Sequence, residues 1–447
     1  MRQTPMLAAL VALLSTSAAR AATVEASSTT FLLLGQEPRF RGGTSPELVT
    51  VAPLFEVLTL SARDIENGFS DDLRIVLSTW GSVDLAERRW DAGMGGRLSG
   101  DVTTGYVQAK FLNRRLTLRA GRSMVPTGVA RMIQLDGGYA TVVIPISVAQ
   151  ISVAAWGGSP TSQRFQGREG IESWNPVGGT LAYGGRVAFG LPIRGIAGRG
   201  LEIGSSANIV TDGGETVREE LGGDIRLQPF RSSNLVLSGF GTYSLPERRL
   251  AEASGAISVS VTRRLHLTAD ARRVEPSLLL SRNSILSVFA DSVWTELGGG
   301  VTYDIGRGLH VGADVHVRAE PGEDGSGSEL GSDVRARADW SRGRTSVGLE
   351  AFRLDAFVNG YVGGRLWARR ELGKAFVTGD VLGTFFREEV NGYDQAITGT
   401  VSAGYPLPYG FNVVVAGSAG MTPYLEQTYD LMLKLAYNQT YRTVEVR

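Results

Sequence analysis

Histidine, serine and carboxylate side chains are the groups in this sequence that could carry out acid–base or metal chemistry. The chain has three histidines, His266, His310 and His316. His310 and His316 are six residues apart in an extended segment. At about 3.3 Å per residue they are about 20 Å apart, too far to share a metal ion or a proton. The sequence has no G-x-S-x-G, H-E-x-x-H or phosphate-loop motif. We therefore expect no catalytic residue, no metal site and no cofactor.

The composition excludes several further classes of protein. The 447 residues contain 45 basic and 45 acidic side chains, a balance that argues against binding to nucleic acid. The absence of cysteine excludes a disulfide scaffold and a thiol nucleophile. Glycine is abundant, with 58 residues against 16 prolines, and lysine occurs only at Lys110, Lys374 and Lys434. At 20% charged residues, the chain is too polar for a bundle of membrane helices.

The first 21 residues have the features of a secretory signal peptide. Arg2 supplies positive charge, residues 6–14 are apolar, and Ala19-Arg20-Ala21 is a small-x-small cleavage signal. An N-terminal anchor helix is the alternative, but the apolar run is short for a membrane span. We predict a signal peptide at 1–21 and an exported mature chain at 22–447.

The rest of the chain alternates apolar and polar residues over segments of about ten to thirteen residues. In residues 309–320, Leu309, Val311 and Val315 share one face, while His310 and Asp314 lie on the other. Strands of soluble sandwiches are usually about five or six residues long, whereas a strand that crosses a bilayer needs about nine to eleven. We count 22 such segments and accept 18 to 22 strands. A periplasmic propeller or solenoid would require a sequence repeat, and none is found.

The connections also favour a membrane barrel, because short turns alternate with longer polar loops. The short connections are Gly306–Gly308, Ser341–Arg344, Glu371–Lys374 and Pro406–Gly410, and the longer ones are Glu320–Glu329, Arg387–Asp394 and Met421–Gln427. A transmembrane helix at Tyr139–Gly158 is a competing interpretation, since this stretch has no charge. Pro145 and the β-branched residues around it favour two strands joined by a hairpin at Pro145–Val148.

The last segment resembles the final strand of bacterial porin-type outer-membrane barrels, because one face runs from Tyr429 through Leu431, Leu433 and Leu435 to Tyr437 and Tyr441. The stretch Leu116–Gly138, with an Ala-Gly-Arg strand followed by Gly, Arg and Asp residues, is also similar to such proteins. The resemblance implies a single large antiparallel transmembrane β-barrel in the Gram-negative outer membrane, with short periplasmic turns and longer outer loops. It also implies contact with outer-membrane lipid and insertion by the barrel-assembly machinery.

A barrel of 18 to 22 strands with polar inward faces predicts a water-filled lumen. We expect charged inward residues to form opposed arginine and aspartate rows that set the preference for ions. Pairing across strands to stabilise the sheet is the alternative role for each of them. The candidate lining residues are Arg115, Arg119, Arg131, Asp136, Arg226, Asp270, Arg272, Asp314, Arg318, Asp333, Arg335, Arg337, Asp339, Arg365 and Arg369.

One loop is a candidate inward segment, and a second is a candidate for contact at the mouth of the barrel. Residues 123–138, with Arg131 and Asp136, are predicted to fold inward, with an ordinary outer loop as the alternative. Residues 159–176 combine aromatic and charged side chains, which suits contact with a sugar or packing over the mouth of the barrel; these are Arg164, Phe165, Arg168, Glu169, Glu172 and Trp174.

The leading functional hypothesis is a passive pore for small hydrophilic solutes or ions. Two alternatives remain: a polysaccharide-export barrel that works with periplasmic secretion partners, and a structural barrel of an envelope or motility assembly. Homo-oligomers are common among porins, so a homo-oligomer is possible. No enzymatic activity is expected.

Overall fold

The structure is a computed structural model and describes residues 22–39, 47–65, 68–86, 98–126, 132–166, 170–176, 179–191, 200–229, 234–279, 293–321, 328–356, 359–423 and 425–443. The predicted signal peptide at 1–21 lies outside the described residues, as does Arg131.

Nearly all of the described chain is β-strand. The strands are Ala22–Arg39 (β1), Glu47–Val51 (β2), Pro53–Arg63 (β3), Asp72–Asp84 (β4), Leu98–Phe111 (β5), Leu116–Pro126 (β6), Met132–Ile146 (β7), Ala149–Gln166 (β8), Gly170–Pro176 (β9), Thr180–Leu191 (β10), Leu201–Asp212 (β11), Glu215–Leu227 (β12), Asn234–Ser244 (β13), Arg249–Ser260 (β14), Leu265–Val274 (β15), Trp294–Gly306 (β16), Leu309–Pro321 (β17), Ser328–Arg342 (β18), Thr345–Asp355 (β19), Gly360–Leu372 (β20), Ala375–Val390 (β21), Tyr393–Pro406 (β22), Phe411–Thr422 (β23) and Leu425–Thr443 (β24). Two short helical turns, α2 (Pro276–Leu279) and η3 (Pro408–Gly410), complete the described elements.

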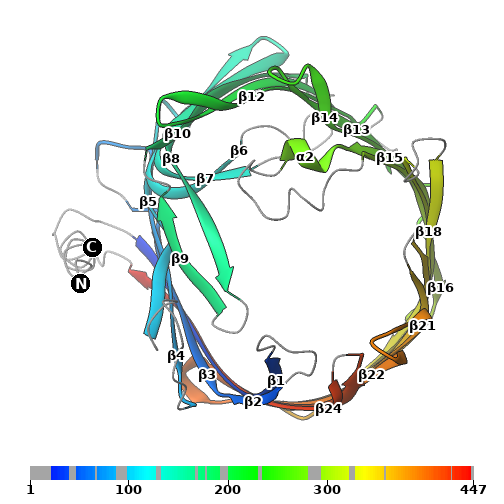
Figure 1. The fold of residues 1–447 in the computed structure, drawn as a ribbon. Helices are drawn as coiled ribbons and strands as arrows, with labels where there is room; N and C mark the ends of the chain where they lie inside the picture. The colour runs from blue at the N-terminus through cyan, green and yellow to red at the C-terminus, as the bar shows by residue number, and fades with distance from the viewer. Residues whose placement is uncertain are drawn as a thin grey trace.

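The strands close into one antiparallel barrel, seen end-on as a ring in Figure 1. The first and last strands, β1 and β24, pair from Ala22–Thr443 to Leu34–Leu431 and seal the barrel. Of the 24 strands, β2 pairs only with β1 and β9 only with β8, so 24 − 2 = 22 strands form the wall. Closure leaves no unpaired sheet edge at membrane depth. The predicted all-β barrel is confirmed, at the upper end of the expected 18 to 22 strands.

The outer face of the wall is apolar and exposed. On β24, the exposed fractions of Tyr429, Leu431, Leu433 and Leu435 lie between 38 and 57%. Directly paired residues of neighbouring strands share a face, so the register assigns a side to each paired residue in the ladder. The exposed apolar face must lie against lipid, and the charged face therefore lines the lumen.

The two ends of the barrel differ. At one end, called the turn end, two-residue turns at 147–148, 307–308, 343–344 and 373–374 join successive strands, and the first and last strands of the wall, β1 and β24, begin and end there. The turn at 147–148 confirms the hairpin predicted at Pro145–Val148. Among the described residues, no helix is long and apolar enough to cross a membrane.

The opposite end, called the loop end, carries the longer connections, including those at 275–293 and 322–327. The predicted alternation of turn lengths is regular from β16 to β21 and breaks down elsewhere: residues 192–200 separate β10 from β11 at the turn end, whereas only Gly213 and Gly214 join β11 to β12 at the loop end. The loop predicted at Arg387–Asp394 is mostly strand, because β21 and β22 continue to a tight turn at Asn391 and Gly392. The longer loop predicted at Met421–Gln427 is also wrong, because β23 continues to Thr422 and β24 begins at Leu425.

Candidate functional site: the charged lumen

Residues 123–126 and 132–138 of the segment expected to be an inward loop are instead part of the wall. β6 continues to Pro126 and β7 begins at Met132, and the two strands pair from Leu116–Val142 to Pro126–Met132. For these residues the inward-loop prediction is wrong, because extended backbone pairing continues through the glycines at 137 and 138.

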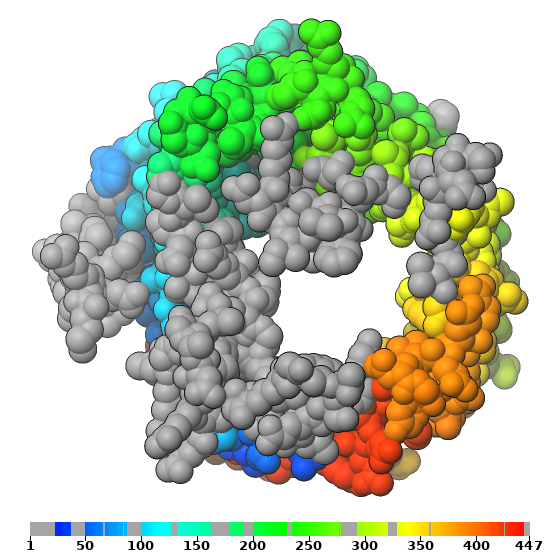
Figure 2. Space-filling view, viewed as in Figure 1, coloured from blue at the N-terminus to red at the C-terminus, as the bar shows by residue number. Residues whose placement is uncertain are grey.

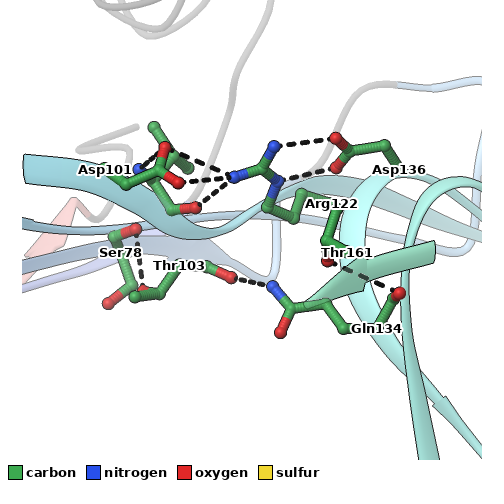
Figure 3. Close-up of polar contacts among 8 residues, drawn as sticks. Ser78, Asp101, Thr103, Arg122, Gln134, Asp136 and Thr161 are labelled. Atoms are coloured by element: carbon green, nitrogen blue, oxygen red, sulfur yellow. Dashed lines mark hydrogen bonds and ion pairs between the residues drawn. The ribbon is translucent and has the colours of Figure 1, made fainter. Parts of the chain in front are cut away.

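Asp136, expected in that loop, is a β7 residue at the loop end. Its carboxylate accepts hydrogen bonds from Arg122 on β6, and Arg122 also contacts Asp101 on β5 (Figure 3). Below this pair in the same view, Gln134 donates to the backbone carbonyl of Thr103. Arg122 therefore ties β5, β6 and β7 together through Asp101 and Asp136.

The β8–β9 hairpin lies inside the ring (Figure 1). β9 pairs with the end of β8 and contacts β5, which is separated from β8 in the wall by β6 and β7. Figure 1 shows this hairpin within the ring. It includes most of the loop predicted at 159–176, whose backbone is strand at 159–166 and 170–176. The side chains of the six candidate residues there lie outside the described residues.

The wall next to this hairpin has an apolar cluster on its inner face. Val125, Leu135, Trp156 and Ala182 are buried, and the Trp156 indole Nε1 donates to Asn208 at 3.4 Å. Open space lies on the other side of the interior: Figure 2 shows an opening along the barrel, bordered by the yellow-to-red part of the wall that contains β17–β24.

Most of the predicted lining residues lie on the lumen face, as the register shows. Arg119 is on β6 and Arg226 on β12; the others are Asp270 and Arg272 on β15, Asp314 and Arg318 on β17, Asp333, Arg335, Arg337 and Asp339 on β18, and Arg365 and Arg369 on β20. Arg115 ends the turn that joins β5 to β6, so it is not a wall residue.

The charges do not form opposed rows, because acids and arginines alternate along the same part of the wall. Arg365 pairs with Asp380 of the neighbouring strand at 2.6 Å, and Arg335 pairs with Asp333 of its own strand at 3.1 Å. Among the described residues, no ion pair involves Arg337. Within the described part of the wall, the lumen surface therefore carries local pairs of opposite charge together with charges, such as Arg337, that form no ion pair.

Sequence reasoning missed several residues of this surface. Arg186 of β10 binds Asp224 of β12 at 2.7 Å, across the glycine of β11 that pairs with both strands. Arg119 donates to Gln108 and lies over the ring of Tyr106, 4.7 Å from its centroid. The alternation of polarity on β10 and β5 is the signal that could have found Arg186 and Gln108.

The three histidines all face the lumen and have different partners. His266 lies between the hydroxyls of Ser258 and Ser260, at 3.2 and 3.1 Å. His310 is 3.7 Å from Asp304, and His316 Nε2 is 3.3 Å from Asp270 Oδ1. The interpretation of the histidines as separate lining residues is consistent with these positions, but His316 has a wider environment that the sequence did not reveal.

Comparison with known proteins finds similarity only in solved structures. No protein-family model and no curated protein matches the chain. OpdK of Pseudomonas aeruginosa, in a crystal structure with vanillate, is 9% identical with a TM-score of 0.46, over 94% of this chain and 99% of that chain. OccAB4 of Acinetobacter baumannii is 7% identical with a TM-score of 0.46, over 95% and 99%.

Proposed function

We propose that this protein is a passive outer-membrane channel through which small hydrophilic solutes or ions cross the lumen. The observation that carries the proposal is the open space inside a closed 22-strand wall whose inner face is charged (Figure 2). A barrel of eight strands is filled by its own side chains, whereas barrels of about sixteen or more strands enclose water. A charged surface next to that space keeps the lumen hydrated and favours polar solutes over lipid.

The narrowest part of this route is proposed to lie where the β8–β9 hairpin faces the charged wall of β15–β21. The hairpin reaches β5 and so covers one side of the interior. A passage limited on one side suits small solutes better than a polymer strand, so we favour a solute channel over polysaccharide export. One chain closes the barrel by itself, and the proposal does not require an oligomer.

The proposal extends to how the barrel reaches its membrane. It includes export through the signal peptide predicted at 1–21 and insertion of the closed barrel by the barrel-assembly machinery. No catalysis is part of the proposal.

The test is conductance of the purified mature chain in planar bilayers. We expect stepwise current increases as single barrels insert, without any partner protein. Circular dichroism dominated by strand must accompany the measurement, so that a folded protein is being tested. A folded barrel that carries no current above the detergent control would contradict the proposal and favour the export or structural role.

A pair of cysteine variants shows whether the current runs through the lumen. The chain has no cysteine, so single cysteines can be introduced without background reactivity. Thr400 faces the lumen through its pairing with Asp380, and the adjacent Val401 faces lipid and is 63% exposed. A charged, water-soluble thiol reagent is expected to change the current of Thr400→Cys. It should leave that of Val401→Cys unaltered.

A further inference from the structure

We propose that Asp270, Glu296 and His316 form a binding site for a divalent transition-metal ion of the Zn²⁺ class on the wall of the lumen. They come from three successive strands, β15, β16 and β17. One ligand atom of each lies within 4.8 Å of the other two. All three side chains are half-buried, so the site has one protein side and one side open to the lumen.

The backbone is shaped to bring His316 to Asp270. The row Asp270–Gly298–His316 crosses three strands in register, with Gly298 in the middle. The imidazole of His316 lies over Gly298, where a Cβ atom would overlap the ring. Glycine therefore allows the ring to cross β16, and Nε2 reaches a position 3.3 Å from Asp270 Oδ1. Any larger residue at 298 would displace the ring.

The charges at the site favour a cation, although two arginines lie in the next row. Arg272 and Arg318 flank Glu296 in the register. Arg272 pairs instead with Glu252 at 2.5 Å, and Arg318 pairs with Glu320. Among the described residues, Glu296 forms no ion pair and Asp270 pairs only with His316. Two carboxylates thus remain without an arginine partner.

The ring of Trp294 explains why Arg272 and Arg318 point away from Glu296. The guanidinium of Arg318 lies 4.5 Å from its ring centroid and that of Arg272 lies 5.5 Å away. Such cation–π contacts, together with the two ion pairs, draw both arginines toward the loop end. Glu296, one pair nearer the middle of the barrel, is left facing Asp270 and His316.

One imidazole nitrogen and two carboxylates suit zinc and its neighbours in the transition series. Zinc ligands at about 2.0–2.2 Å in a tetrahedron lie about 3.3–3.6 Å from one another. The His316–Asp270 distance of 3.3 Å already meets this, and rotation of the half-buried Glu296 side chain would complete it. Water from the lumen would occupy the fourth position.

Binding is tested on the folded barrel in detergent with Co²⁺ and Zn²⁺ as probes. The protein must carry an affinity tag without histidine. Calorimetry with Zn²⁺ and the visible absorption of tetrahedral Co²⁺ report the site directly and do not depend on conductance. We expect one strong site per chain in the native sequence. We also expect an affinity at least about tenfold lower in His316→Gln, Asp270→Asn and Glu296→Gln.

Two further variants distinguish a specific three-residue metal site from non-specific binding of the cation to acidic groups. His310→Gln should retain binding, because His310 lies on the same strand and face but is not part of the three-residue cluster; it is 3.7 Å from Asp304. Gly298→Ala keeps all three ligands but displaces the ring, and should weaken binding as much as His316→Gln. Equal binding by the native chain and His316→Gln, or equal loss in His310→Gln, would overturn the proposal.

An effect of the ion on current rests on the proposed channel function and is measured separately. Zn²⁺ should reduce the conductance of native barrels, relative to their own metal-free value, and should not reduce that of His316→Gln. If the native barrel carries no current, the proposed channel function is contradicted. The metal site is then judged by the Zn²⁺ and Co²⁺ binding measurements alone. Current that Zn²⁺ affects equally in both proteins would contradict a role of this site in conduction.

Discussion

Arg122 and Asp136 form a two-fold hydrogen-bonded ion pair between β6 and β7, with both Nε–Oδ1 and Nη2–Oδ2 at 2.7 Å. The side chain of Arg122 is only 15% exposed and reaches Asp101 as well. A bidentate, partly buried pair of this kind stabilises the protein more than an exposed one, because solvent screens it less. Asp136 is therefore a structural anchor of the loop end.

We expect Arg122→Met to lower the free energy of unfolding by about 2–4 kcal/mol, because it leaves two carboxylates without their cation. Asp136→Asn should cost less, since Asp101 still accepts from Arg122. The measurement is urea unfolding of the folded barrel in lipid vesicles, arranged as a double-mutant cycle. The exposed pair Arg335–Asp333 is the control and should show a coupling of about 0–1 kcal/mol. Similar coupling energies for the two pairs would refute the structural role.

Gly121, next to Arg122, is required by the backbone of β6. Its φ is +117°, and a Cβ atom there would overlap the carbonyl of Gly105 on β5. We expect Gly121→Ala to destabilise the barrel by about 1–3 kcal/mol through backbone strain and displacement of the strand pair. Gly379→Ala is the matched control, because Gly379 has open space around its Cα and is expected to tolerate the methyl group. Thermal or urea unfolding of both variants compares them; an equally stable Gly121→Ala would contradict this account.

The wall could be predicted from the sequence because one face of every strand meets lipid. In residues 309–320 this gives strict alternation, and β17 spans Leu309–Pro321. Both the hairpin at 147–148 and the 22-strand wall follow from the same period-two pattern. The pattern was weaker evidence at 123–138, where glycines at 137 and 138 suggested a loop although their backbone is paired.

The lumen surface could be predicted only as a list of charges. Alternation gives the face of Asp270 or His316, but the partner of each depends on strand register, which one sequence does not determine. His316 was therefore compared with His310 on its own strand, and its neighbours on β15 and β16 were missed. The turn of Arg272 and Arg318 toward Trp294 depends on side-chain packing between strands and has no sequence signal.

Glu56 is an exception to the alternation and allows a test of which face meets lipid. It pairs with Thr30, which pairs with Leu435 of the lipid-facing row, and its carboxylate accepts hydrogen bonds from Ser28 and Thr30. A carboxylate on this face is unfavourable in lipid, and the two hydroxyls partly offset that cost. We expect Glu56→Leu to be neutral or to stabilise the barrel by about 1 kcal/mol, and Thr30→Val to destabilise it by about 1–2 kcal/mol. Unfolding in vesicles measures both, and a strongly destabilised Glu56→Leu would mean that this face does not contact lipid.

The charges of the Arg365–Asp380 pair are expected to influence the ion preference of the channel. Both groups face the lumen, and their nitrogen and oxygen are 2.6 Å apart, so together they present little net charge to a passing ion. Asp380→Asn leaves Arg365 uncompensated and should shift the reversal potential in a salt gradient toward anions, while Arg365→Gln should shift it toward cations. A unit charge about 8 Å from an ion in water contributes about 0.5 kcal/mol, so each permeability ratio should change about twofold at low salt. The double variant restores the charge balance and should return close to the native ratio. Shifts of the same sign in the two single variants would show that the pair acts through barrel structure and not through its charges.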